Sequence, residues 1–241
     1  MISVCIATFN GEKYIREQLT SILLQLSDDD EIIISDDLST DHTLDIINEL
    51  HDKRIRVLHH SKGKYRYSFD YTTHNIENAI NHSQGDVIFL ADQDDVWLPN
   101  KIEVMMPYLE QYDLVLSDCT VVDENLRIQH LSYFDLVSSK QGIFRNLMKN
   151  AYLGCCMAFK RKLLKYALPF PSSMVAHDIW LGLIAEKKGT VYFLNTPTML
   201  YRRHSLNVSS SSTHSPYSLN FKIYYRVRII WSLAKKIVFL K

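Results

Sequence analysis

The stretch that decides the fold is VIFLADQDDVWLP, Val87 to Pro99, in which an apolar run ends abruptly in acidic residues. The run has the composition of a buried β-strand. Three carboxylates follow it closely, at Asp92, Asp94 and Asp95. Such close neighbours repel one another unless a cation or a proton intervenes. The stretch therefore predicts either a solvated turn that caps the next helix or a site for a positively charged group.

Apolar runs that are followed by polar residues recur through the first hundred residues. Apolar, β-prone runs lie at 3–9, 31–35, 55–59 and 86–91, and helical spacing lies between them at 15–26, 39–50 and 75–83. This order predicts a mostly parallel sheet with helices on both faces. Ligands of such sheets bind beyond the carboxyl ends of the strands. We therefore expect Thr8–Asn10, Asp36–Asp37 and Asp92–Asp95 to share one edge.

The second half of the chain is less regular. The pattern predicts one or two strands over 113–123, a strand over 152–159, a short helix over 160–168, an amphipathic helix over 177–187 and short strands at 191–194 and 198–203. The serine-rich segment 204–218 predicts a loop or flexible lid. Only seven glycines occur, and none forms the glycine-rich pattern that cradles phosphates.

Composition indicates an ordinary globular protein of one large domain, with 241 residues of which 46% are apolar. The four cysteines show no metal-binding spacing, which predicts buried free thiols in a reducing compartment. The amino terminus lacks a basic leader, and no apolar run reaches the ~18 residues that span a bilayer. These features predict a cytoplasmic protein.

Charge is divided unevenly along the chain. All 27 acidic residues lie within 1–186, whereas 187–241 holds ten lysines and arginines and no acid. Residues 221–241 combine six of these cations with five aromatic side chains. That mixture is typical of a helix at an anionic membrane surface, although a packed helix with a solvated basic face would look the same. No base-reading motif accompanies the charge, so no nucleic-acid partner is expected.

Four motifs in order carry a resemblance to a known family. They are ISVCIATFNGEKYIREQLTSIL (2–23), EIIISDDLSTDHT (31–43), GDVIFLADQDDVW (85–97) and YRRH (201–204). Together they resemble inverting family 2 glycosyltransferases of the GT-A fold, over roughly residues 2–209. The DQDDVW form is similar to bacterial enzymes of O-antigen, capsule and wall polysaccharide synthesis, including rhamnosyltransferase-like members.

The resemblance implies an α/β GT-A domain, built on a mostly parallel sheet flanked by helices, over residues 1–216. Within it, 1–118 would bind the nucleotide sugar and the less regular 119–216 would bind the acceptor. A basic amphipathic helix would follow over 217–241. The expected partners are a UDP- or dTDP-sugar donor and a glycan or lipid-linked oligosaccharide acceptor, and the expected location is the inner face of the plasma membrane.

The resemblance also assigns roles to individual residues. Thr8 and Asn10 match positions that contact the nucleotide, and Asp37 matches the carboxylate that accepts the ring N–H of a pyrimidine base. Asp92 would face the ribose and Arg202 a phosphate. Leu38 departs from the small or polar residue usual in this motif, which could alter the base pocket.

The resemblance assigns metal and base roles to three further residues. Asp94 and His204 would hold Mn²⁺ or Mg²⁺, which suits oxygen-rich sites that share phosphates with substrate. Asp178 matches the general base, and His177 stands where the family usually has an acid. From the residues alone, Asp178 could equally be the carboxylate that caps the helix at 177–187.

The expected activity is a metal-dependent displacement at the anomeric carbon, with one base and inversion. Two alternatives stay open at this point. One is an aspartyl-phosphate phosphotransferase with Asp92 as nucleophile, although that motif is expected on the first strand. The other is a non-catalytic scaffold that binds nucleotide sugars.

Overall fold

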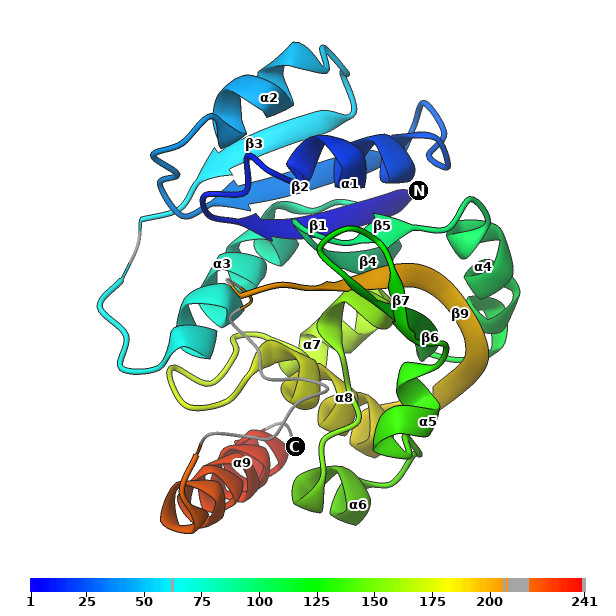
Figure 1. Ribbon diagram of the computed structural model, residues 1–241. Coiled ribbons are helices and arrows are strands. Elements are labelled where there is room, and N and C mark those ends of the chain that lie inside the picture. The colour runs from blue at the N-terminus through cyan, green and yellow to red at the C-terminus, as the bar shows by residue number, and fades with distance from the viewer. Residues whose placement is uncertain (62, 206, 208–216, 240–241) are drawn as a thin grey trace.

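The structure is a computed structural model that describes residues 1–61, 63–205, 207 and 217–239 (Figure 1). Within these residues the strands are β1 Ile2–Thr8, β2 Glu31–Asp36, β3 Ile55–His59, β4 Val87–Asp92, β5 Val96–Trp97, β6 Leu114–Asp123, β7 Ile128–His130, β8 Met157–Lys160 and β9 Val191–Arg203. They form one sheet in the order β3-β2-β1-β4-β8-β6-β9-β5, with β7 on β6.

Helices cover this sheet on both sides. They are α1 Ile15–Leu23, α2 Thr43–Glu49, α3 Ser68–His82, α4 Lys101–Gln111, α5 Tyr133–Val137, α6 Ile143–Met148, α7 Leu164–Ala167, α8 His177–Lys188 and α9 Leu219–Phe239, with short 3₁₀ turns η1 Gly154–Cys156 and η2 Arg161–Leu163. Figure 1 shows α1 and α3 on opposite sides of β1.

The first hundred residues fold as the alternation predicts. β1 pairs in parallel with β2 and with β4, and β2 pairs in parallel with β3. Because Thr8 pairs with Asp36 and Ala7 pairs with Asp92, the three polar strand ends lie side by side. The expected common edge is therefore confirmed. One boundary differs, since α3 begins at Ser68, seven residues before the expected start, in a stretch whose aromatic and threonine residues obscure helical spacing.

The second half adds antiparallel pairings and makes the sheet mixed. β8 is antiparallel to both β4 and β6, and β5 is antiparallel to β9. The strand expected over 152–159 is wrong in its first part, because Gly154–Cys156 forms a 3₁₀ turn and β8 starts at Met157. That segment is apolar because it is buried, and burial does not require a strand.

The two short strands expected near residue 200 are a single long one. β9 runs for 13 residues beside β6, and the register shifts at Asp118. Asn195 and Thr196 are exposed at this irregularity, which interrupts the apolar pattern. β9 carries its chain end back to β5 and hence to the acidic turn after β4. Of the expected loop over 204–218, residues 206 and 208–216 lie outside the described part of the chain.

Helix α8 is embedded in the core and fixes the residues at its start. Trp180 is 1% exposed, and its indole N–H donates to the carbonyl of Ala167 at 2.9 Å. Gly182 lets the Tyr152 ring approach closely, since a Cβ there would lie 2.4 Å from a ring carbon. Packing on several sides holds the amino-terminal end of α8 in place against the sheet edge.

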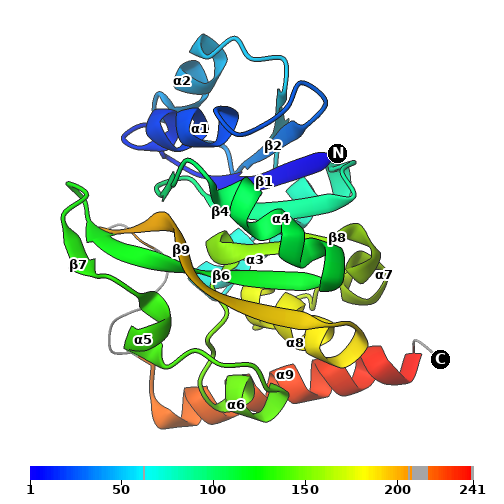
Figure 2. The ribbon, with the colours of Figure 1, turned by 90° about the vertical axis from the view of Figure 1, so that its right-hand side faces the viewer.

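The basic helix expected at the carboxyl end is present as α9. It lies along the lower edge of the molecule, beside α6 and beneath α8 (Figure 2). Ile229 and Leu233 anchor it with 0% and 8% exposure. Among the described residues, none of the helices combines the length and hydrophobicity needed to cross a membrane.

Candidate active site

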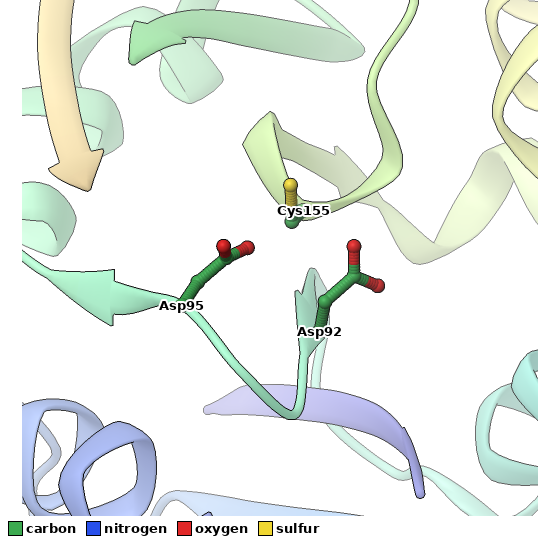
Figure 3. A group of neighbouring side chains, drawn as sticks. All are labelled: Asp92, Asp95 and Cys155. Carbon is green, nitrogen blue, oxygen red and sulfur yellow. The ribbon is translucent and has the colours of Figure 1, made fainter. Parts of the chain in front are cut away.

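The acidic turn after β4 closes on the η1 turn of the second half. Figure 3 shows Asp92, Asp95 and Cys155 as neighbours at this turn, and one ligand atom from each lies within 4.8 Å of the others. Burial, followed by the charge of Asp94, raises the pKa of Asp92 to about 7. The same causes raise the pKa of the fully buried Asp95 well above its usual range. A positive charge near this turn would therefore stabilise the ionised carboxylates.

Cys155 does not compensate the charge of these acids. Burial raises the pKa of its thiol well above the usual range, so the thiol carries no charge in this arrangement. A buried ammonium lies nearby instead: Lys101 is 0% exposed and donates to the carbonyl of Cys155 at 2.8 Å. Its Nζ also lies 4.6 Å from the centre of the Trp97 ring. Lys101 also interacts electrostatically with Asp95, so its charge partly offsets that of the acids.

Asp94 turns away from this buried group toward the end of β9. Its Oδ2 lies 2.8 Å from His204 Nε2 and accepts a hydrogen bond from Asn207 Nδ2 at 2.9 Å. The His204 ring stacks on Tyr14 with ring centres 4.9 Å apart. A carboxylate oxygen and an imidazole nitrogen that converge in this way match the donors of a Mn²⁺ or Mg²⁺ site, with imidazole favouring the softer ion. The two predicted metal ligands therefore meet.

Arg202, for which a phosphate contact is expected, is buried and bound by protein groups in this structure. It is 3% exposed, and its guanidinium pairs with Glu17 and donates to the carbonyls of Asp94 and Glu124. Its backbone N–H donates to Asp95 Oδ1 at 2.9 Å. Arg202 thus ties β9 to the acidic turn, and its cationic donors are already used by protein groups.

The ends of β1 and β2 form a second polar cluster. Asp37 is 4% exposed, and its Oδ1 lies 2.5 Å from His60 Nδ1. The Thr8 hydroxyl donates to Asp36 at 3.0 Å, whereas Asn10 accepts the backbone N–H of Thr40 at 2.8 Å. The structure brings the predicted nucleotide-binding residues together, and it occupies Thr8 and Asn10 in holding the two strand ends.

Strained backbone accompanies these strand ends. Asn10 and Leu38 have φ angles of 49° and 61°, in the left-handed region that glycine adopts most easily. Leu38 is also 53% exposed, directly beside the buried Asp37. A large apolar side chain held outward in a strained conformation is a feature often found at ligand sites.

Asp178 approaches the acidic turn from the other half of the chain. It lies in the first turn of α8, where its Oδ1 accepts the N–H of Ile179 at 2.6 Å and its Oδ2 lies 3.5 Å from Asn150 Nδ2. Burial raises its pKa to about 6. Its charge is among the causes that raise the pKa of Asp92, so the two carboxyl groups are within electrostatic reach.

His177 stands next to this carboxyl as a neutral side chain. Burial lowers its pKa to about 4, and its Nδ1 has no hydrogen-bond partner among the described residues. Gly154 makes room for the ring, since a Cβ there would lie 2.6 Å from His177 Nε2. A neutral imidazole thus replaces the acid that the resemblance would place here.

Several members of the site carry little signal in the sequence. His60 and Asn207 contact acids that lie far from them in the chain, and Lys101 contacts the distant carbonyl of Cys155, so no local pattern could reveal them. Asn207 had the best available signal, because it follows the YRRH motif by three residues.

Comparison with known proteins places the chain in a family. The model of the family described as "Glycosyl transferase family 2" matches residues 3–167. The chain is 30% identical to the dTDP-rhamnosyl transferase RfbG of Shigella flexneri, over 83% of this chain and 72% of that protein. It is 27% identical to the putative teichuronic acid biosynthesis glycosyltransferase TuaG of Bacillus subtilis, over 88% and 82%.

Solved structures share the fold. S. aureus TarS 1–349, in complex with UDP-GlcNAc, superposes with a TM-score of 0.69 at 22% identity, over 98% of this chain and 69% of that one. The mannosyltransferase PcManGT of Pyrobaculum calidifontis, in complex with GDP-Man and Mn²⁺, gives 0.59 at 18%, over 98% and 73%. The α/β architecture is thus that of GT-A glycosyltransferases. With a family model that matches well over half of its residues, the chain belongs to glycosyl transferase family 2 and is a glycosyltransferase.

Proposed function

We propose that this enzyme is a metal-dependent, inverting glycosyltransferase that moves one sugar from a UDP- or dTDP-sugar to a bacterial surface-polysaccharide acceptor. The observation that carries the proposal is the convergence of two groups from opposite halves of the chain. The acidic turn comes from β4, and Asp178 comes from the start of α8. A displacement needs a cationic site for the leaving diphosphate and a base on the other side of the sugar.

Asp94 and His204 would hold the divalent cation, and Asn207 would orient both. When bound, Mn²⁺ or Mg²⁺ stabilises the negative charge that grows on the departing diphosphate. Asp92 would face the ribose from the end of β4. Arg202 supports the proposal indirectly, because it holds the backbone of Asp94 and Asp95 in position.

The nucleotide would bind at the ends of β1 and β2. Asp37 would accept the ring N–H of the pyrimidine, beside Thr8 and Asn10, and His60 would keep the Asp37 carboxylate oriented through their 2.5 Å contact. The relatives support a pyrimidine donor, since RfbG is named for dTDP-rhamnose and the E. coli protein WfgD for UDP-Glc. WfgD is 22% identical over 88% of this chain.

Asp178 would act as the general base. Its carboxylate takes the proton of the acceptor hydroxyl while the acceptor oxygen bonds to the anomeric carbon. The bond from that carbon to the diphosphate breaks, and its electron pair leaves with the phosphate oxygen. One displacement inverts the anomeric centre. A pKa of about 6 leaves Asp178 ionised at neutral pH yet basic enough to accept a proton.

The acceptor would be a lipid-linked oligosaccharide at the inner face of the plasma membrane. WfgD supports this choice, because its name specifies a diphosphoundecaprenol acceptor. The basic α9 supports peripheral contact with anionic lipid, since it contains no acidic residue.

The test is donor binding and slow hydrolysis across UDP- and dTDP-sugars, with Mn²⁺, Mg²⁺ or EDTA. We expect metal-dependent binding of one donor, with release of its nucleoside diphosphate. Binding without turnover towards any acceptor would favour the scaffold alternative. Phosphatase activity without donor binding would assign the acids at 92–95 to phosphoryl transfer.

A further inference from the structure

Two neighbouring helices expose large apolar side chains to solvent. On α9 these residues recur at three- and four-residue spacing, which places them along one side of the helix. They are Leu219, Ile223, Tyr224, Val227, Ile230 and Trp231, each at least 51% exposed. Phe144 and Met148 of α6 are 86% and 67% exposed. Apolar patches of this kind mark interaction surfaces, and we call this one the α6–α9 face.

The two helices are joined at this face by Arg226. Its Nε donates to the carbonyl of Leu147 at 3.0 Å, and its Nη2 donates to that of Met148 at 2.5 Å. Arg226 therefore places the end of α6 beside Ile223 and Ile230, one helical turn away on either side.

The charge around the α6–α9 face identifies its partner. Neither 136–177 nor 187–241 contains an acid, and α6 and α9 come from these two segments. Arg228 and Lys235 flank the exposed Trp231, with cation-to-ring distances of 5.2 and 4.8 Å. Basic groups mixed with exposed aromatic and aliphatic residues suit an anionic lipid surface, where cations meet phosphates and apolar side chains enter the acyl boundary.

The opposite side of α9 contacts the segment that precedes the base. The Tyr225 hydroxyl accepts the backbone N–H of Ala176 at 3.4 Å, two residues before Asp178. Burial, followed by the charge of Asp178, raises the pKa of Tyr225, in agreement with the closeness of the two residues. From the other side, Thr73 of α3 accepts the backbone N–H of His177 at 3.1 Å. The base thus sits between α3 and α9.

A second connection runs through α6. Arg226 binds the last carbonyls of α6, and Asn150 follows two residues later. The Asn150 amide lies 3.5 Å from Asp178 Oδ2. Both segments that surround the base carboxylate are therefore attached to α9, whose outer side is the apolar and basic one.

We propose that the α6–α9 face docks on an anionic lipid bilayer and that α9, through Tyr225 and Arg226, transmits docking to Asp178. Docking fixes α9 and α6 against the membrane, and their inner contacts then fix the base in its working position. The inference rests on the proposed function, because it assigns the base role to Asp178.

The test compares donor hydrolysis by the full chain with vesicles that contain phosphatidylglycerol and with vesicles of phosphatidylcholine alone. We expect sedimentation with the anionic vesicles and about threefold or greater stimulation of hydrolysis. Ile230→Glu should lose both while keeping hydrolysis in solution unchanged. Leu24→Glu is the matched control: Leu24 is 82% exposed directly after α1, and the variant should behave as the wild type.

Tyr225→Phe separates docking from its transmission, because it keeps the ring and removes the hydroxyl that meets Ala176. It should sediment with anionic vesicles like the wild type and lose most of the stimulation. Absence of vesicle binding in the wild type would overturn docking, and equal stimulation of Tyr225→Phe would overturn the coupling. Failure to hydrolyse any donor would overturn the proposed function instead, and sedimentation would still test docking by itself.

Discussion

The half proposed to bind the donor, residues 1–118, and the half proposed to bind the acceptor, residues 119–216, contribute to the candidate active site by different means; they are called the donor half and the acceptor half below. In the donor half, side chains come to the edge at the ends of successive parallel strands. In the acceptor half, Asp178 is positioned by the start of α8, and His204 follows the end of the long strand β9, which pairs with β6 and β5. In the regular half, parallel strand pairing is enough to align the polar strand ends at one edge. In the irregular half, the position of each functional side chain depends on tertiary packing.

Removal of the carboxylate proposed to bind the metal should have the largest effect on donor binding and transfer. Asp94→Ala loses the oxygen that faces His204, so donor binding should lose its dependence on Mn²⁺ or Mg²⁺ and transfer should fall by about 10²-fold or more. Calorimetric titration with and without EDTA checks this. Asp29→Ala changes an exposed acid and should leave both measurements unaltered. Metal-dependent binding that survives in Asp94→Ala would move the cation site elsewhere.

The pH dependence of transfer should report on the acceptor half. Burial raises the pKa of Asp178 to about 6, and the ionised form is the one that accepts a proton. The rate with saturating donor should therefore be level above pH 7 and fall about tenfold per unit below pH 6. A rate that stays level down to pH 4.5 would contradict an Asp178 base.

His60 tests a contact within the donor half that only the fold creates. His60→Leu leaves Asp37 without its 2.5 Å partner, so the donor dissociation constant should rise about three- to tenfold. His59→Leu is a matched control, because its side chain is exposed on the neighbouring position. Equal effects of the two substitutions would mean that His60 does not orient Asp37.

The smallest expected effect concerns the strained strand end. Leu38→Gly relieves a φ of 61° and removes a side chain that is half exposed, so the free energy of unfolding should rise by about 0.5–1 kcal/mol. Denaturant titration measures this. A simultaneous fall in donor affinity would indicate that the Leu38 side chain contacts the nucleotide. A decrease in the free energy of unfolding would contradict the prediction, because the packing of Leu38 would then outweigh its backbone strain.

The sequence predicted the donor half in most of its detail because its signals are local. Apolar runs, helical spacing and acids at strand ends all fall within short windows, and parallel pairing then brings Asp37 and Asp92 to one edge. The resemblance supplied Asp94 and His204, which the fold places 2.8 Å apart.

The rest of the site depends on contacts that no short window contains. Lys101 meets the carbonyl of Cys155 across 54 positions of sequence, and His60 meets Asp37 across 23. Arg202 belongs to the YRRH motif and is expected to contact phosphate, and the sequence does not reveal that its guanidinium also pairs with Glu17 and donates to two carbonyls. Side-chain partners of this kind follow from tertiary packing, which periodicity does not encode.

The most direct test of the account is a paired measurement on Asp178→Asn: donor dissociation constant and transfer rate under identical conditions. The amide keeps the shape of the side chain but cannot take a proton. The account predicts a dissociation constant within about threefold of the wild type and a transfer rate lower by about 10²–10⁴-fold. Transfer within tenfold of the wild type would contradict it, because the base would then lie elsewhere.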